Sequence, residues 1–151
     1  MKFSTRARYG LRAMLELALV YDLNEPTPLF KIAEKQSISE GYLEQMMTVL
    51  RKEGLVQSVR GAQGGYLLSR EPARITAGEI VRRLDGPLGP TGCVSEEDQE
   101  NCIRSEYCVT RTLWEKVREA IASTLDDTTL ADLCEETEKL RRSRDADMYC
   151  I

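Results

Sequence analysis

Three cysteines, Cys93, Cys102 and Cys108, are the residues of this sequence whose types and spacing best suit chemistry. They lie in a connecting segment rich in glycine, proline and acidic residues, and the chain of 151 residues contains no histidine. Thiolates are soft ligands that suit zinc and iron-sulfur clusters, and a loop lets three of them converge. We therefore expect a metal-responsive or redox-responsive segment that stays loose until something binds it.

The identity of the ligand and of its fourth donor is left open by this segment. A closed zinc site takes a fourth nitrogen or sulfur ligand, which the lack of histidine makes harder to supply, so an iron-sulfur cluster is the better fit. No sequence rule selects a fourth ligand among the carboxylates between the cysteines, which are Glu96, Glu97, Asp98, Glu100 and Glu106. The competing interpretation is three ordinary loop thiols.

The other two cysteines lie outside this segment. We expect Cys134 on the core face of the last helix and Cys150 as an exposed thiol in the tail.

Several classes of protein are excluded by what the sequence lacks. Without histidine there is no Ser-His or Cys-His dyad, and no Walker loop or C-x-x-C motif is present, so we do not expect an enzyme. Clustered cysteines inside the cell are typical of metal or redox chemistry and not of a disulfide framework. The longest apolar stretch, 13–21, is too short to span a bilayer, and no signal-peptide pattern opens the chain. We expect a cytoplasmic protein without a membrane partner.

Charge is divided unevenly along the chain, whose net charge is -4. Residues 1–86 carry 13 Lys/Arg and 10 Asp/Glu, whereas residues 87–151 carry 8 and 15. Four basic residues precede the first acidic one, and they are Lys2, Arg6, Arg8 and Arg12. A surface that binds a polyanion must therefore lie in the first half, and a first helix with this basic start is placed to lie on phosphates.

Apolar spacing in the first 86 residues predicts four helices and a hairpin. The helices cover about 5–23, 29–35, 40–53 and 77–84, and Ser39 and Thr76 supply N-terminal caps for the last two. Two strand-like runs, 55–59 and 65–69, flank the glycine-containing turn 60–64 and predict a hairpin. Together these elements predict a mainly α fold, a winged helix-turn-helix domain with a small β-hairpin wing plus a long C-terminal dimerisation helix.

The composition divides the chain into four parts. They are a winged-helix DNA-binding domain (1–86), a cysteine-containing cluster-binding loop (87–108), dimerisation helices (109–142) and a flexible tail (143–151). The long helix predicted over 109–125 has an apolar side that includes Leu113, Val117 and Ile121. A lone helix of this kind has no partner in the monomer. We therefore expect a homodimer that binds a palindromic operator in double-stranded DNA.

Polar side chains at the start of the third helix and in the hairpin are the main candidate contacts to DNA. The candidates are Ser39, Tyr42, Glu44, Gln45, Arg60, Gln63, Arg6 and Arg51. Glutamine can pair with adenine and glutamate can accept from the cytosine amino group, whereas serine and tyrosine suit phosphates. Arginine at the mouth of a hairpin suits a narrow minor groove. The competing interpretation, an amphipathic helix with a solvated face, is disfavoured by the hairpin beside it.

Several motifs in a fixed order make the chain similar to a known family. They are STRARYG at 4–10, SEGYLEQ at 39–45, LRKEGLV at 50–56, VRGAQGGYLL at 59–68, the three-cysteine segment, and TLADL at 129–133. Together they resemble the IscR/NsrR family of iron-sulfur-responsive winged-helix transcription regulators over nearly the whole chain. The wing and the third helix are most similar to those of IscR-type members.

The resemblance implies a 2Fe-2S cluster held by Cys93, Cys102 and Cys108, and a 4Fe-4S cluster, as in NsrR-like relatives, stays open. Two departures concern this site. The gap between Cys93 and Cys102 is longer than usual, and Arg111 stands three residues after Cys108, where IscR-type members carry a histidine. Because arginine does not ligate iron, the fourth ligand is a carboxylate, a hydroxyl, a backbone group, an exogenous thiol, water or another cysteine.

The function implied by the resemblance is repression of genes for iron-sulfur cluster biogenesis, with the cluster-assembly machinery as the source of the cluster. Cluster binding would order residues 88–108 and change the posture of both DNA-reading helices. One alternative is a regulator of the same fold that senses oxidants, nitric oxide or thiols, or docks a partner enzyme, without a stable cluster. Another is a zinc-stabilised adaptor with no role at DNA.

Overall fold

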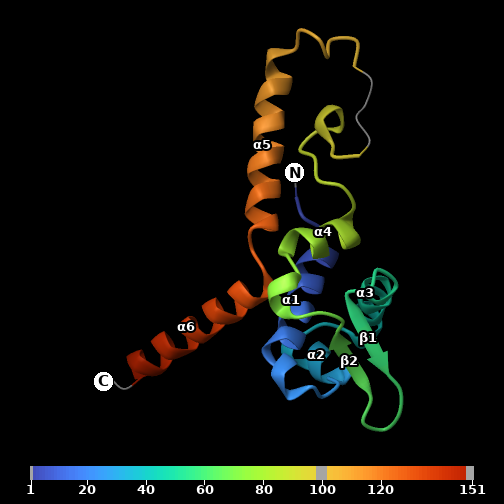
Figure 1. Cartoon of the computed structure of the whole chain (residues 1–151), viewed down its shortest axis with the longest axis vertical. Helices are drawn as coiled ribbons and strands as arrows, with labels where there is room; N and C mark the ends of the chain where they lie inside the picture. The colour runs from blue at the N-terminus through green and yellow to red at the C-terminus, as the bar shows by residue number, and fades with distance from the viewer. Residues whose placement is uncertain (1, 98–101, 149–151) are drawn as a thin grey trace.

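The computed structural model of the chain describes residues 2–97 and 102–148 (Figure 1). Within them the α-helices are α1 (Thr5–Leu19), α2 (Leu29–Gln36), α3 (Glu40–Lys52), α4 (Ala77–Asp85), α5 (Val109–Asp126) and α6 (Leu130–Met148). The strands are β1 (Val56–Val59) and β2 (Gly65–Leu68). Short 3-10 helices are η1 (Tyr21–Leu23), η2 (Pro72–Arg74) and η3 (Gly92–Val94). This order confirms the predicted winged helix-turn-helix fold.

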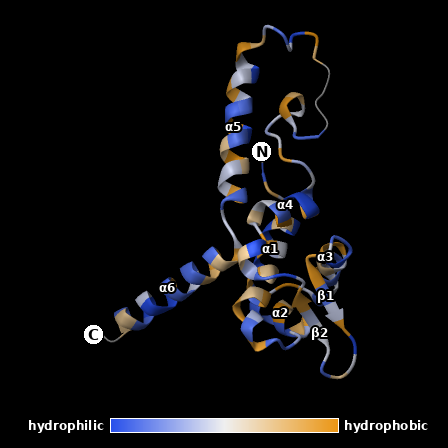
Figure 2. Cartoon of the chain, viewed as in Figure 1, coloured by the Kyte–Doolittle hydropathy of each residue, from blue (hydrophilic) through white to orange (hydrophobic). Residues whose placement is uncertain are grey.

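Helices α1 to α4 and the hairpin enclose one hydrophobic core. Among its fully buried side chains are Met14, Ile32, Leu43, Met46, Met47, Leu50, Leu55 and Ile80. No polar or charged side chain is buried among the residues that the structure describes. Figure 2 shows hydrophobic residues gathered in this part of the molecule. The helix-turn-helix is therefore held rigidly by its own apolar interior.

The hairpin is fixed to the turn that precedes α2. β1 and β2 pair antiparallel, and Val59 lies opposite Gly65. The backbone N–H of Thr27 donates to the Tyr66 carbonyl at 3.0 Å, and the Tyr66 N–H donates to the Thr27 carbonyl at 2.9 Å. A Cβ at Gly65, whose φ is +158°, would overlap the Thr27 backbone, so this approach requires glycine.

Short polar side chains start four of the described helices, and at α6 the Thr129 hydroxyl accepts from the Asp132 N–H at 3.1 Å. The hydroxyl of Ser4 accepts from the Ala7 N–H at 3.0 Å. Ser39 accepts from the Tyr42 N–H at 3.2 Å, and Thr76 accepts from the Glu79 N–H at 3.1 Å. The predicted caps at Ser39 and Thr76 are confirmed, and each satisfies a backbone donor that the first turn leaves unpaired.

Helices α5 and α6 extend away from the core in different directions (Figure 1). The start of α6 is held by backbone pairing, because the Ala77 N–H donates to the Thr128 carbonyl at 2.8 Å and the Leu130 N–H donates to the Ile75 carbonyl at 2.9 Å. Leu130 is fully buried, whereas none of the 18 residues of α5 is buried. Within the two described stretches, no helix has the length and apolarity needed to cross a membrane.

Two predicted helix boundaries were wrong. The first helix ends at Leu19, and its predicted last turn to about Leu23 is instead η1. The last helix runs to Met148, so residues 143–148 of the predicted flexible tail are helical. No glycine or proline interrupts 130–148, and pairs such as Arg142–Glu138, one turn apart at 3.4 Å, support the extra turns.

Candidate functional site

The first turns of α3 present polar side chains to solvent. Glu44 and Gln45 are exposed, and Ser39 is exposed at the N-cap, where its oxygen accepts from the backbone. Tyr42 is half-buried, and its ring packs edge-on against Tyr9 with 6.4 Å between ring centroids. Tyr42 therefore has a packing role that its prediction as a phosphate contact did not include.

Tyr9 and Arg12 of α1 are part of this surface, and we had not predicted their pairing. The Arg12 guanidinium lies 5.2 Å from the centroid of the Tyr9 ring, a cation-π distance. Tyr9 in turn contacts Tyr42, so the basic start of α1 is joined to the start of α3. The i,i+3 spacing of Tyr9 and Arg12 on a predicted helix was the available signal.

The tip of the hairpin is a tight turn with exposed polar side chains. The Gly64 N–H donates to the Gly61 carbonyl at 3.0 Å, and Arg60 and Gln63 are exposed beside this turn. Arg51, near the end of α3, donates to the Ser58 hydroxyl of β1 at 3.4 Å. Figure 1 places α3 and the hairpin on the same side of the core, away from α6. We call the exposed polar side chains of α3 and the hairpin the α3–hairpin surface. Arg6 is half-buried on the first turn of α1.

The first part of the cysteine segment, residues 88–96, is a closed loop and not the loose one we expected. The Leu88 N–H donates to the Glu96 carboxylate at 2.9 Å, and the Glu96 N–H donates to the Leu88 carbonyl at 3.0 Å. Leu88 and Val94 are buried. Cys93 is half-buried within this loop, with its Sγ 3.3 Å from the Thr91 hydroxyl. The first cysteine therefore sits on a fixed support.

The second part, residues 102–108, is open to solvent. Cys102 is exposed, and Ile103 has 93% of its surface exposed. Cys108 is the N-cap of α5, and its Sγ lies 3.2 Å from the Thr110 hydroxyl. This hydrogen bond, followed by one from the Arg111 N–H, lowers the pKa of Cys108 and so favours its thiolate.

The described residues do not bring the three cysteines together. Within 2–97 and 102–148, no three Cys, Asp or Glu side chains are placed to hold a metal ion. The donor chemistry of three thiols fits an iron-sulfur cluster, but their positions do not converge. Of the candidate fourth ligands, Glu96 is engaged by Arg82 at 2.7 Å, and Asp98 and Glu100 lie outside the described residues.

The other two cysteines lie apart from this segment. Cys134 packs half-buried against the core on α6, as we predicted, and burial raises its pKa, with Glu138 and Asp22 adding to the effect. Cys150 lies outside the described residues.

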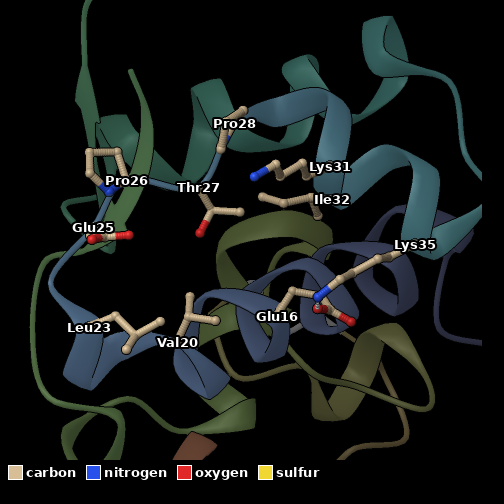
Figure 3. A pocket seen from close by; sticks show the side chains of 10 residues that line it. All are labelled: Glu16, Val20, Leu23, Glu25, Pro26, Thr27, Pro28, Lys31, Ile32 and Lys35. Atoms are coloured by element: carbon tan, nitrogen blue, oxygen red, sulfur yellow. Dashed lines mark hydrogen bonds and ion pairs between the residues drawn. The ribbon is translucent and has the colours of Figure 1, made fainter. Parts of the chain in front are cut away.

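A cavity of about 320 Å³ lies between the end of α1, η1 and the start of α2 (Figure 3). Its lining is partly apolar, and the Lys35 ammonium forms an ion pair with Glu16 at 2.9 Å on one wall. None of the candidate DNA contacts and none of the cysteines lines it. The candidate functional residues are therefore on the α3–hairpin surface and in the cysteine segment.

Comparison with known proteins decides the family. The model of the Rrf2 family, described as iron-dependent transcriptional regulators, matches residues 3–136. The chain belongs to the Rrf2 family. This membership confirms the predicted resemblance to IscR/NsrR-type regulators. It also confirms the prediction of a DNA-binding transcriptional regulator and not an enzyme.

Two kinds of Rrf2 regulator resemble the chain. The regulator CymR of Bacillus subtilis is 45% identical over 138 residues, covering 91% of this chain and 93% of CymR. IscR of Yersinia enterocolitica is 41% identical, covering 88% of this chain and 79% of IscR.

Solved structures give the same two likenesses. CymR, described as the global cysteine regulator of B. subtilis, matches 90% of this chain and 98% of its own with a TM-score of 0.75. T. potens IscR is 44% identical and also has a TM-score of 0.75, over 93% of this chain and 90% of its own. The fold is therefore shared by both kinds, and the fold alone does not select what is sensed.

Proposed function

We propose that this Rrf2 regulator represses genes for iron-sulfur cluster biogenesis and that a 2Fe-2S cluster on Cys93, Cys102 and Cys108 sets its affinity for DNA. The observation that carries the proposal is the set of three thiols in one segment of a chain whose family is described as iron-dependent regulators, with Cys108 at the start of α5. The thiolate is the form that binds metal. Cys93 of the fixed part and Cys102 and Cys108 of the exposed part would hold the cluster, which would supply iron–thiolate bonds to these residues.

Glu96 is the less favoured candidate for the fourth ligand of this proposed cluster, because both of its carboxylate oxygens already accept from Arg82. Arg111 is paired with Glu115 at 3.1 Å and carries no lone pair for iron. Glu97, Glu106, Asp98 and Glu100 stay candidates, with a hydroxyl, a backbone group, an exogenous thiol, water or another cysteine. A 4Fe-4S cluster and the cluster-assembly machinery as its source also stay open predictions.

Anaerobic purification followed by a visible absorption spectrum and iron and sulfide analysis tests the cluster. We expect a brown protein with equal amounts of iron and sulfide, and loss of both in Cys102→Ala. Cys134→Ala is the matched control, because Cys134 lies on α6 against the core, and it should keep the full content. Full cluster content in Cys102→Ala would show that the ligand assignment is wrong.

The proposed DNA contacts are those of the α3–hairpin surface. In this proposal Glu44 and Gln45 meet base edges in the major groove, and Ser39 and Tyr42 lie at phosphates. Arg60 and Gln63 reach the minor groove from the hairpin tip. The basic side chains that complete the contact with phosphates are Arg6 and Arg51.

Substitution of single contacts tests this surface. Gln45→Ala and Arg60→Ala should each cost about 1–3 kcal/mol of operator affinity, because each removes a base contact. Arg51→Ala should weaken binding to all sequences alike. It should also lower the slope of log affinity against log salt concentration by about one, the value of one phosphate contact. Arg142→Ala, on α6, is the control. If Gln45→Ala and Arg60→Ala both bind the operator as tightly as the wild type, the contact surface lies elsewhere.

We propose that α5 forms the homodimer. Val109 and Leu113 are exposed on it, and a nonpolar groove of about 330 Å³ is lined by Phe3 with Ala120, Ile121, Thr124 and Leu125. Figure 2 shows hydrophobic residues recurring along this helix outside the core. A second copy of α5 is the simplest cover for this face. Such a dimer would present two α3 helices to successive turns of a palindromic operator.

A second candidate is a regulator of the same fold that responds to thiols or oxidants without a stable cluster. It is favoured by the likeness to CymR, a cysteine regulator by its description, and by the thiolate-favouring position of Cys108. A colourless protein that cannot be reconstituted with iron and sulfide, but whose operator affinity changes on oxidation, would support this candidate over the first.

A further inference from the structure

Helix α4 carries two neighbouring arginines that form ion pairs with different elements of the fold. Arg82 forms ion pairs with Glu96 of the cysteine segment at 2.7 Å and with Asp126, the last residue of α5, at 2.6 Å. Arg83 forms an ion pair with Glu53, the C-cap residue of α3, at 3.0 Å. We propose that Arg82 is a positioning residue that transmits the state of the cysteine segment to α3 through α4.

The contacts of Arg82 use most of its donors. Its Nε donates to the Glu96 carboxylate at 2.8 Å and its Nη2 donates to the same group at 2.7 Å. Nη1 and Nη2 donate to the Asp126 carboxylate at 2.6 and 3.0 Å. A planar guanidinium that serves two carboxylates in this way fixes their relative position as well as their distance.

The ion pair between Arg82 and Glu96 is partly shielded from water. The side chains of Arg82 and Glu96 are only 27% and 23% exposed, respectively. Hydrogen bonds from Arg82 are the largest cause of a lowered pKa at Glu96. A shielded ion pair is less weakened by salt than a pair on the open surface. The Arg82–Glu96 contact can therefore hold the loop in a fixed position relative to α4.

The Arg82–Glu96 ion pair connects α4 to the fixed loop that contains Cys93. Glu96 closes that loop through its two hydrogen bonds with Leu88, and Cys93 lies three residues before it. Arg118 of α5 donates to the carbonyl of Val94 at 3.2 Å and ties the same loop to the long helix. A displacement of Cys93 would therefore be passed to Glu96 and then to Arg82.

Asp126 gives Arg82 a second connection to the cysteines. It ends the 18-residue helix that Cys108 begins, so the two lie at opposite ends of a rod of about 27 Å. A movement at Cys108 would tilt α5 against Arg82 at its other end. The ion pairs of Arg82 are thus connected to the elements that contain the first and the last of the three cysteines, Cys93 and Cys108.

The backbone of α4 is shaped for this contact. A Cβ at Gly78, one turn before Arg82, would overlap the carboxylate of Asp126 and the guanidinium of Arg82. Arg82, Arg83, Glu53 and Asp126 also line one cleft of about 490 Å³. The two ion pairs are therefore neighbours on a single face, and α4 between them packs on α1 and α3.

The inference rests on the proposed function, since it needs a cysteine segment and a DNA reader that affect each other. Linkage makes the coupling measurable without a cluster, because operator binding must then change the cysteine segment. The probe is a duplex selected by the wild-type protein from random sequences. The readouts are the alkylation rate of Cys93 by N-ethylmaleimide, located by mass spectrometry, and amide exchange of 88–96, in cluster-free protein with and without the duplex.

In the wild type we expect the duplex to change the Cys93 alkylation rate by about five-fold or more. In Glu96→Gln the duplex should change the Cys93 alkylation rate by less than about two-fold. The cluster-free variant should still bind the duplex with an affinity within about three-fold of that of the wild type. Arg82→Lys, which keeps the charge but loses the two-carboxylate geometry, should be intermediate. Glu71→Gln breaks an exposed ion pair with Arg74 and is the matched control.

The outcomes separate the two proposals. A duplex effect that is as large in Glu96→Gln as in the wild type overturns the relay and leaves the proposed function standing. No duplex effect in the wild type, with DNA binding intact, overturns the coupling in the proposed function and the relay with it. If Glu96→Gln has a lower melting temperature but shows the same duplex effect as the wild type, the ion pairs of Arg82 only stabilise the fold. That result also overturns the relay.

Discussion

The winged-helix half and the half that contains the cysteine segment and α5 are held by different kinds of contact. In the first, the helices pack on fully buried side chains such as Met46 and Leu50, and Ser4, Ser39 and Thr76 cap the helices. In the second, none of the residues of α5 is buried, and the segment before it is attached through the buried Leu88 and Val94 and through the polar contacts of Arg82 and Arg118. The helix-turn-helix has its apolar core within one chain, whereas the proposed function assigns to the second half a ligand and a second copy that would complete it.

This difference explains how such a regulator can be switched without being unfolded. A close-packed core moves as a unit, whereas an exposed helix and an open loop are drawn from the less stable end of the structure. In the proposed function, a ligand at the cysteines or a second copy at α5 would therefore change the position of a helix-turn-helix that is already formed. The predictions below test this division, starting with the largest expected effect.

Leucine-to-alanine substitutions should separate the two halves most strongly. Leu50→Ala removes a fully buried side chain of α3 and should lower the free energy of unfolding by about 2–5 kcal/mol. Urea unfolding followed by circular dichroism measures it. A loss below about 1 kcal/mol would contradict the account of a close-packed reader.

The same substitution on α5 should change association. Leu113 is 54% exposed in the single chain, so Leu113→Ala should weaken the dimer by about 1.5–3 kcal/mol, the value of burying that side chain against a partner. Sedimentation equilibrium measures the dimer dissociation constant. A wild-type protein that is monomeric at every concentration, or a variant that dimerises as tightly, would show that α5 is not the interface.

Helix caps give a smaller contrast between the halves. Ser39→Ala removes the cap of α3 and should cost about 1 kcal/mol of stability. At the N-cap of α5, the side chain of Cys108 makes no capping hydrogen bond among the described residues, so Cys108→Ala should stay within about 0.5 kcal/mol of the wild type. Thermal unfolding of metal-free protein compares them, and an equal loss in both would remove the contrast.

The pH dependence of stability should report the attachment of the sensing half. Arg82 lowers the pKa of Glu96 in the folded protein, so the stabilisation by this carboxylate is complete above its unfolded pKa and is lost as the pH falls through the lower, folded value. Stability of the wild type should therefore fall more between about pH 6 and pH 3 than stability of Glu96→Gln. Parallel curves for the two proteins would contradict this attachment.

The sequence predicted the reader well because local signals and the core agreed there. Ser39 and Thr76 marked helix starts, and glycines such as Gly65 marked the hairpin, so the fold of the first half followed from patterns of short range. The end of α6 was missed because charged, exposed helices lack an apolar stripe to define them. The candidate DNA contacts stay predictions from the same local signals, which did not indicate the pairing of Tyr9 with Tyr42.

The support of the cysteine segment was not predictable in the same way. Glu96 was one of five similar carboxylates between the cysteines, and nothing local distinguishes it from Glu97. Its role depends on Arg82, 14 residues away, and on Asp126, a further 30 residues along the chain. Contacts of this range follow from the packing of α4 against α5, which the helical pattern of either helix does not specify.

The most direct test of the central claim compares operator affinity in two states of the cysteines. Fluorescence anisotropy would measure binding of the selected duplex by wild-type protein purified without oxygen, before and after removal of the cluster or oxidation of the thiols. The control is a variant in which Cys93, Cys102 and Cys108 are all alanine. We predict a difference of about five-fold or more in the wild type and none in the variant. Equal affinities of the wild type in both states would contradict the account.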